Sequence, residues 1–101
     1  MNADFSDQTV WLRREGLAEA ELDGERVVWD PRTSQVVRLD RIGSLIWSTM
    51  GDGVSIGELL AVLADVFDAP IERVREDVAP FLERLAAAGL IYQRPARGHV
   101  P

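Results

Sequence analysis

The side chains that most often carry catalysis are scarce in this chain of 101 residues. It has no cysteine and one histidine, His99, so it lacks a nucleophile–base pair of the usual kind and the ligands of a typical zinc site. Asp65 and Asp68 could act as acid and base, but acidic side chains are common on solvated helices. The glycines of residues 51–53 lack the lysine and the spacing of a phosphate-binding loop. We therefore expect a protein that is not an enzyme and that binds no metal or cofactor.

A different chemistry, backbone hydrogen bonding by an unpaired strand, is suggested by residues 35–39. They include Val36, Val37 and Leu39, a β-branched run that predicts a strand, and their only charged side chain is Arg38. This is the last of three predicted strands, so it lies at an edge of the sheet. Edge strands expose free N–H and C=O groups, which most proteins protect with charges or prolines. We expect this bare edge to be either covered or used for binding.

An antiparallel meander of three strands is predicted to position this edge. Segments 17–22 and 26–29 flank an Asp-Gly pair, which is typical of a hairpin turn because both central residues need positive φ. The Asp-Pro-Arg-Thr segment at 30–33 predicts a second turn, which leads into strand 35–39. The last strand is therefore paired on one side only.

Helical periodicity replaces the strand pattern after residue 39. Asp40 is a natural N-cap, so the last strand runs into the first helix without a loop. Ser55 and Glu58 form a capping box for a second helix. A third helix begins near Ile71 and is expected to stop at Gly89. The sequence thus predicts a small sheet followed by three helices.

The tryptophans test how these elements pack. Trp29 and Trp47 lie among apolar neighbours, so we expect both in the core. Trp11 lies in a short apolar run at residues 10–12, which predicts either an extra strand or an arm packed on the body. Residues 90–92 predict a short closing strand.

Charge and length limit the partners and the location. The formal net charge is -6 and every basic residue is arginine, a composition unfavourable for binding nucleic acid or an anionic membrane. We find neither a secretion signal nor a stretch of about 18 apolar residues, so we expect a cytoplasmic protein. The expected organisation is a flexible N-terminus at 1–9, a single domain at 10–93 and a flexible tail at 94–101.

Several short motifs recur in a characteristic order between about residues 17 and 92. They are the Asp-Gly hairpin, Val-Arg-Leu-Asp before a helix that holds Ile46-Trp47, then Asp52-Gly53, Glu58-Leu59-Leu60, Asp77-Val78, Phe81-Leu82, Leu85 and Gly89-Leu90. Their order and spacing resemble the PqqD-like family. Its members are the peptide chaperones, or RiPP recognition elements, of pathways that make peptide natural products from ribosomal precursors.

The resemblance implies a winged-helix-like α+β fold, with a three-stranded antiparallel meander followed by three helices. It also implies that the chain binds the leader segment of a precursor peptide and presents it to a modifying enzyme, such as a radical SAM enzyme, a leader peptidase or a cyclase. In that family the leader adds to the third strand and its side chains enter a groove beside the third helix. The matching positions are Gln35, Val36, Val37, Arg38 and Leu39 on the strand, and Arg73, Val74, Asp77, Val78 and Phe81 on the helix.

Two residues depart from the family pattern. Asp40 stands where the family often has asparagine, a change that keeps the helix cap. Pro80 lies inside the helix that forms one wall of the groove, and we expect it to kink that helix. Such a bend would change which leader fits.

Two other readings of the fold remain open. A winged helix can bind DNA through its third helix. Residues 71–89 contain the basic residues Arg73, Arg75 and Arg84 but also four acidic residues, and the resulting net charge of -1 disfavours contact with phosphates. Alternatively the chain is a structural subunit whose edge strand pairs in a homodimer, or that edge is covered by the segment around Trp11.

Overall fold

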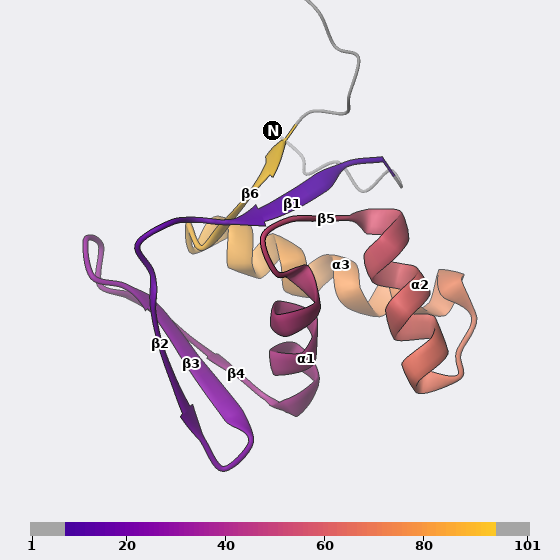
Figure 1. Cartoon of the computed structure of the whole chain (residues 1–101), viewed down its shortest axis with the longest axis horizontal. Coiled ribbons are helices and arrows are strands. Elements are labelled where there is room, and N and C mark those ends of the chain that lie inside the picture. The colour runs from indigo at the N-terminus through magenta and orange to yellow at the C-terminus, as the bar shows by residue number, and fades with distance from the viewer. Residues whose placement is uncertain (1–7, 95–101) are drawn as a thin grey trace, which may run out of the picture.

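The computed structural model describes residues 8–94, which form two small sheets and three helices (Figure 1). The elements in chain order are β1 (Val10–Arg13), β2 (Ala18–Leu22), β3 (Glu25–Asp30), β4 (Gln35–Leu39), α1 (Arg41–Met50), β5 (Val54–Ser55), α2 (Ile56–Phe67), α3 (Ile71–Ala87) and β6 (Ile91–Arg94). This order confirms the winged-helix-like α+β class. His99 and the outer parts of both predicted flexible ends lie outside the described residues. None of the helices described here is long and apolar enough to span a membrane.

The predicted meander is confirmed, with strand bounds within one residue of those expected. β2, β3 and β4 are neighbours in that order and antiparallel. Asp23 and Gly24 form the first turn with φ of 55° and 82°, which explains the Asp-Gly pair. In the second turn the Asp30 carbonyl accepts hydrogen bonds from the N–H groups of Thr33 and Ser34, at 3.2 and 2.9 Å.

A second antiparallel sheet places β1 between β5 and β6. Trp11 pairs with Val54 on one side and with Gln93 on the other, and its side chain is buried. The guanidinium of Arg13 lies over the ring of Trp47, 4.6 Å from its centroid, and so joins this sheet to α1. The segment around Trp11 is therefore an extra strand, and it pairs in this second sheet rather than along β4.

The helix ends follow the predicted signals. Asp40 Oδ1 accepts from the N–H of Gly43 at 2.7 Å, which confirms the N-cap of α1. Ser55 and Glu58 form the capping box of α2. Gly89 has a φ of 78°, a conformation that glycine adopts without strain, just beyond the end of α3. α1 therefore starts at the end of β4, which brings its first turn to one end of the exposed strand.

One face of the meander packs against the helices. Val28 and Leu39 are fully buried on this face, and Trp47 is fully buried opposite them on α1. Val28 lies opposite Val37, whose partly buried side chain packs on the same core. The prediction that Trp47 lies in the core is correct.

The prediction that Trp29 lies in the core is wrong. Alternate residues of a strand point to opposite faces, and Val28 occupies the face that the helices cover. Trp29 therefore points to the opposite face, where it is half-buried and outside the core cluster. Because Val27, Val28 and Trp29 are all apolar, either face of β3 could be buried, and the packing of the helices selects the face of Val28.

Candidate functional site

β4 is an open edge of the meander. β3 pairs with it on one side, and within residues 8–94 no strand pairs with it on the other. The side chains of Gln35, Val36 and Arg38 are exposed, with Val36 at 62%, whereas Val37 is partly buried. Leu39 is fully buried and pairs with Arg26 of β3.

The single charge on this strand does not protect its edge. Arg38 forms an ion pair with Glu25 of β3, with an N–O distance of 2.7 Å. Its guanidinium is thereby directed across the sheet towards the neighbouring strand. The N–H and C=O groups along the outer side of β4 are left available for a further strand.

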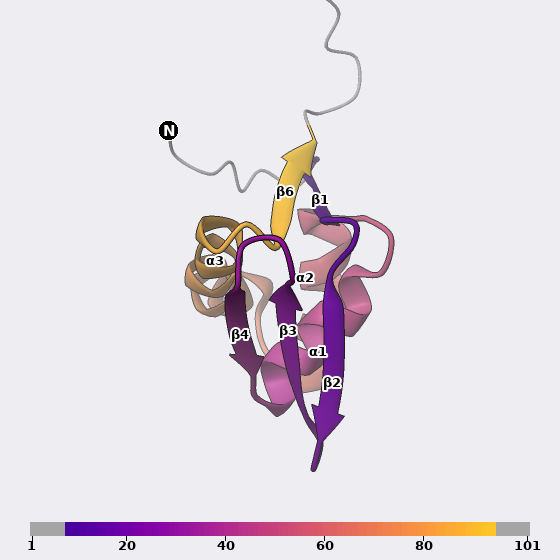
Figure 2. The same ribbon diagram turned by 90° about the vertical axis from the view of Figure 1, so that its left-hand side faces the viewer.

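α3 runs beside this edge in the opposite direction. Three hollows lie between β4 and α3. From one hollow to the next, the lining residue on β4 or its cap comes later in the sequence, while the lining residue on α3 comes earlier. The first contains Gln35 and Ala87, the second Arg38 and Arg84, and the third Asp40 and Phe81. Figure 2 shows β4 on the side of the sheet where α3 lies. Together these hollows form a groove along the open strand.

The third hollow is a largely apolar cavity of about 430 Å³ between α1 and α3, here called the α1–α3 pocket. Ile42 and Phe67 form an exposed apolar rim, with 54% and 42% of their surface accessible, and Val74 and Val78 are buried deeper. The full lining is Asp40, Ile42, Gly43, Ile46, Phe67, Ala69, Arg73, Val74, Asp77, Val78 and Phe81. The pocket has the composition that suits one bulky apolar side chain.

Gly43 allows the walls of this pocket to approach closely. A Cβ at this position would lie 3.0 Å from Cε1 of Phe81 and 3.2 Å from Oδ1 of Asp40. The first turn of α1 therefore lies directly against the Phe81 ring. The guanidinium of Arg84, which lines the second hollow, also lies over that ring, 5.5 Å from the ring centroid. Phe81 thus forms a wall shared by the pocket and the middle of the groove.

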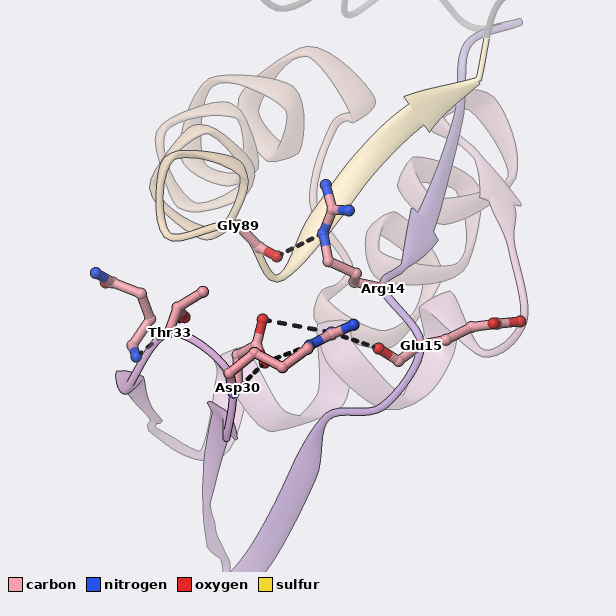
Figure 3. A network of polar contacts seen from close by, with 7 residues as sticks. Arg14, Glu15, Asp30, Thr33 and Gly89 are labelled. Carbon is pink, nitrogen blue, oxygen red and sulfur yellow. Dashed lines mark hydrogen bonds and ion pairs between the residues drawn. The ribbon is translucent and has the colours of Figure 1, made fainter.

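A polar network fixes the start of β4 at the other end of the groove (Figure 3). Asp30 Oδ1 accepts hydrogen bonds from the backbone N–H and the Nε of Arg32, both at 2.9 Å. These bonds lower the pKa of the Asp30 carboxyl below its usual value. Arg32 also donates to the carbonyl of Glu15 at 2.7 Å, and Arg14 donates to the carbonyl of Gly89 at 2.9 Å. The β3–β4 turn and the end of α3 are thereby both linked to the segment that follows β1.

The structure brings the two halves of the sequence-derived site into one groove. All five α3 positions expected from the family pattern line the α1–α3 pocket, and the β4 positions border the open edge. Six pocket residues were not among the expected site residues: Asp40, Ile42, Gly43, Ile46, Phe67 and Ala69. Ile42 carries a weak signal, because a helix whose first turn exposes a large apolar residue is unusual. α3 is helical through Pro80, and the kink at that residue stays a prediction.

The described residues offer no alternative site of metal chemistry. Within 8–94 no group of three or more histidine, cysteine, aspartate or glutamate side chains could hold a metal ion. Of the carboxylates near the groove, Asp40 caps α1 and Asp30 is bound by Arg32. The groove therefore offers backbone groups, an apolar pocket and a few charges, which is the chemistry of recognition.

Comparisons with known proteins identify a family and a similar fold. The model of the family described as "Coenzyme PQQ synthesis protein D (PqqD)" matches residues 25–91, more than half of the chain. A solved structure described as "TbiB1 in Complex with the TbiA(beta) Leader Peptide" is similar in fold, with a TM-score of 0.70 and 24% identity. The alignment covers 89% of this chain and 99% of that one. No match was found among the curated proteins.

Proposed function

Because the chain belongs to the PqqD family, we propose that it binds the leader segment of a ribosomally made precursor peptide and presents the precursor to a modifying enzyme. The observation that carries the proposal is the open edge of β4 beside an apolar pocket. The TbiB1 structure, similar in fold, holds a leader peptide, which supports the same use of this groove. The proposal assigns the chemical step to the partner enzyme and a non-catalytic role to this chain, in the cytoplasm where the precursor is made.

Strand addition explains how the leader is held. An extended peptide beside Gln35–Leu39 would exchange backbone hydrogen bonds with β4, which give affinity with little dependence on sequence. Since successive side chains of a strand point to opposite faces, alternate leader residues would face α3. Sequence preference then comes from the hollows of the groove.

The α1–α3 pocket is the strongest source of that preference. A bulky apolar side chain would bury surface against Ile42, Phe67 and Phe81, at roughly 25 cal/mol per Å². Arg73 and Asp77 lie at the mouth with opposite charges, so the pocket does not favour a net charge on the ligand. The proposed roles are backbone pairing for β4 and apolar capture for α1 and α3.

The proposal is tested with the leader of a precursor identified by inspecting the neighbouring reading frames, N-methylated at one position at a time. Each methyl group removes one backbone donor, so affinity should fall roughly tenfold at alternate residues of the bound segment. The residues between them point their N–H groups away from β4 and should tolerate methylation. Calorimetric titration of the unchanged protein measures both sets.

A period of two along the leader is the expected result. Losses without that period would mean that the leader is held by side chains or as a helix. If the unmodified leader does not bind at high micromolar concentration, the proposed function is wrong. Sedimentation in the same buffer would then show whether the β4 edge pairs with a second copy.

A further inference from the structure

The face of the meander that points away from the helices is unusually apolar. The register places Ala18, Trp29 and Val36 in one row across the three strands, and Ala20 and Val27 in the next. We call this surface the outer face; Leu22 at the end of β2 completes it. The solvated side of an antiparallel sheet normally carries polar side chains.

The exposure of the outer face shows that no part of residues 8–94 covers it. Leu22 is 73% exposed, and Val36 and Ala20 are also exposed. None of Trp29, Val27 or Val36 belongs to the core cluster or packs against it. Figure 2 shows the three strands in front of the helices, with no element across them.

The outer face carries no net charge, unlike the protein as a whole. Its charged residues are Glu25 and Arg38, and these neutralise each other in an ion pair at one end. The chain as a whole carries a net charge of -6. A neutral apolar patch on an acidic protein is suited to a partner surface that is itself apolar and uncharged.

The outer face is continuous with the leader site. Val36 and Arg38 are on β4, so a leader strand added to that edge would extend the pleat by one strand. The alternate leader side chains that do not face α3 would then lie beside Val36, on the same surface. A protein docked here would contact the recognition domain and its bound leader together.

We propose that the outer face is the docking surface for the modifying enzyme, which thereby binds the leader-loaded domain in preference to the empty one. This inference rests on the proposed function, because the leader forms part of the surface. A second copy in the same place would bring two chains of net charge -6 together and would cover the outward side chains of the leader. The continuity with the β4 edge therefore favours the enzyme as the occupant.

A matched pair of substitutions tests the docking surface. Ala20→Glu places a charge on the outer face at β2, the strand farthest from the leader edge. Ala61→Glu makes the same change on the exposed side of α2, away from the sheet. Both alanines are exposed, so both variants should fold, which thermal melting followed by circular dichroism checks.

The probes are a modifying enzyme and a precursor leader identified by inspecting the neighbouring reading frames, titrated against each full-length variant. Ala20→Glu should weaken enzyme binding at least roughly tenfold, since it buries an unpaired charge in an apolar interface. Ala61→Glu should leave enzyme binding unchanged, and both variants should bind leader as the wild type does. The wild type should bind the enzyme about five-fold or more tightly when leader is saturating.

The outcomes separate this inference from the proposed function. Unchanged enzyme binding in Ala20→Glu, or equal affinity for the empty and the loaded domain, would overturn the docking surface while leader binding stands. Self-association of the wild type that Ala20→Glu abolishes would also overturn it, because the occupant would then be a second copy. Failure of the wild type to bind leader would instead refute the proposed function.

Discussion

The two edges of the meander have the same kind of backbone but different protection. β2 at one edge carries the exposed Glu21; its other acidic side chain, Glu19, is held across the sheet by Arg26 of β3 at 2.8 Å, as Arg38 is by Glu25. β4 at the other edge has only Arg38, whose guanidinium is held over the sheet by Glu25. Acidic side chains along an edge discourage further pairing, whereas a bare edge invites it.

The surroundings of the two edges differ in the same sense. α3 runs along β4 and encloses a groove with it, as the three hollows between them show. The hollow at β2 joins Glu19 to Trp47 of α1 and to the segment that follows β1, and its lining is more polar than apolar. A strand added at β4 would therefore gain apolar side-chain contacts that this hollow does not offer at β2. The two edge strands offer the same backbone groups. The side chains and the neighbouring helix therefore select β4 as the edge that binds.

The largest expected effect comes from placing proline in each edge strand. Val36→Pro should reduce leader affinity at least roughly a hundredfold, because proline removes one of the N–H groups that point away from β3 and forces φ. Glu21→Pro makes the corresponding change on the outer side of β2 and should leave leader affinity unchanged. Calorimetric titration gives both affinities, and circular dichroism reports whether each variant is folded.

Both proline variants should lose stability, so the comparison between them is the informative result. A folded Val36→Pro that binds leader normally would show that the leader does not add to β4. Loss of binding in a folded Glu21→Pro would show that the two edges have been assigned the wrong way round.

An intermediate effect is expected from two exposed apolar residues near the two edge strands, Ile42 just after β4 and Leu22 at the end of β2. Ile42→Ser removes half of the rim of the α1–α3 pocket and should weaken leader binding roughly tenfold. Leu22→Ser removes a more exposed apolar side chain at the end of β2 and should not alter it. Fluorescence titration of both variants distinguishes a specific pocket from general surface stickiness, which would make the two losses equal.

The smallest effect concerns the network that holds the start of β4. The pKa of Asp30 is lowered in the folded chain by hydrogen bonds from Arg32, so its carboxylate contributes stability above the unfolded value of about 3.9. That contribution is lost as the pH falls through the lower pKa of the folded state. Asp30→Asn should therefore reduce the melting temperature by a few degrees at neutral pH and flatten the fall in stability below about pH 4.

Thermal melts of wild type and Asp30→Asn across this pH range measure the effect. If the melting temperatures of the two proteins fall in parallel to the lowest pH measured, the pKa of Asp30 is the same in the folded and unfolded chains. Leader affinity at neutral pH should change little, because the substitution affects the turn before β4 and none of the groups proposed to bind.

Local signals made most of the fold predictable from sequence. The Asp-Gly pair, the Asp40 cap and the capping box of Ser55 with Glu58 act within a few residues, and each is where it was expected. The face of β3 was not predictable, because Val27, Val28 and Trp29 are all apolar and only the packing of the helices selects Val28 for the core.

The site was predictable where it depends on a single element. The bare edge of β4 follows from its sequence, and the α3 positions follow from the family pattern. The contribution of α1 was missed, because it depends on the approach of its first turn to α3. Gly43 permits that approach, but a glycine near the start of a helix does not reveal which distant ring it will face.

Strand addition of the leader at β4 is tested most directly by a backbone amide NMR titration, which observes both edges of the meander in one sample. We expect saturable shifts and slower hydrogen exchange at alternate amides of Gln35–Leu39, with Ala18–Leu22 unchanged. Protection that appears at Ala18–Leu22 instead, or saturable binding without any change along Gln35–Leu39, would contradict it.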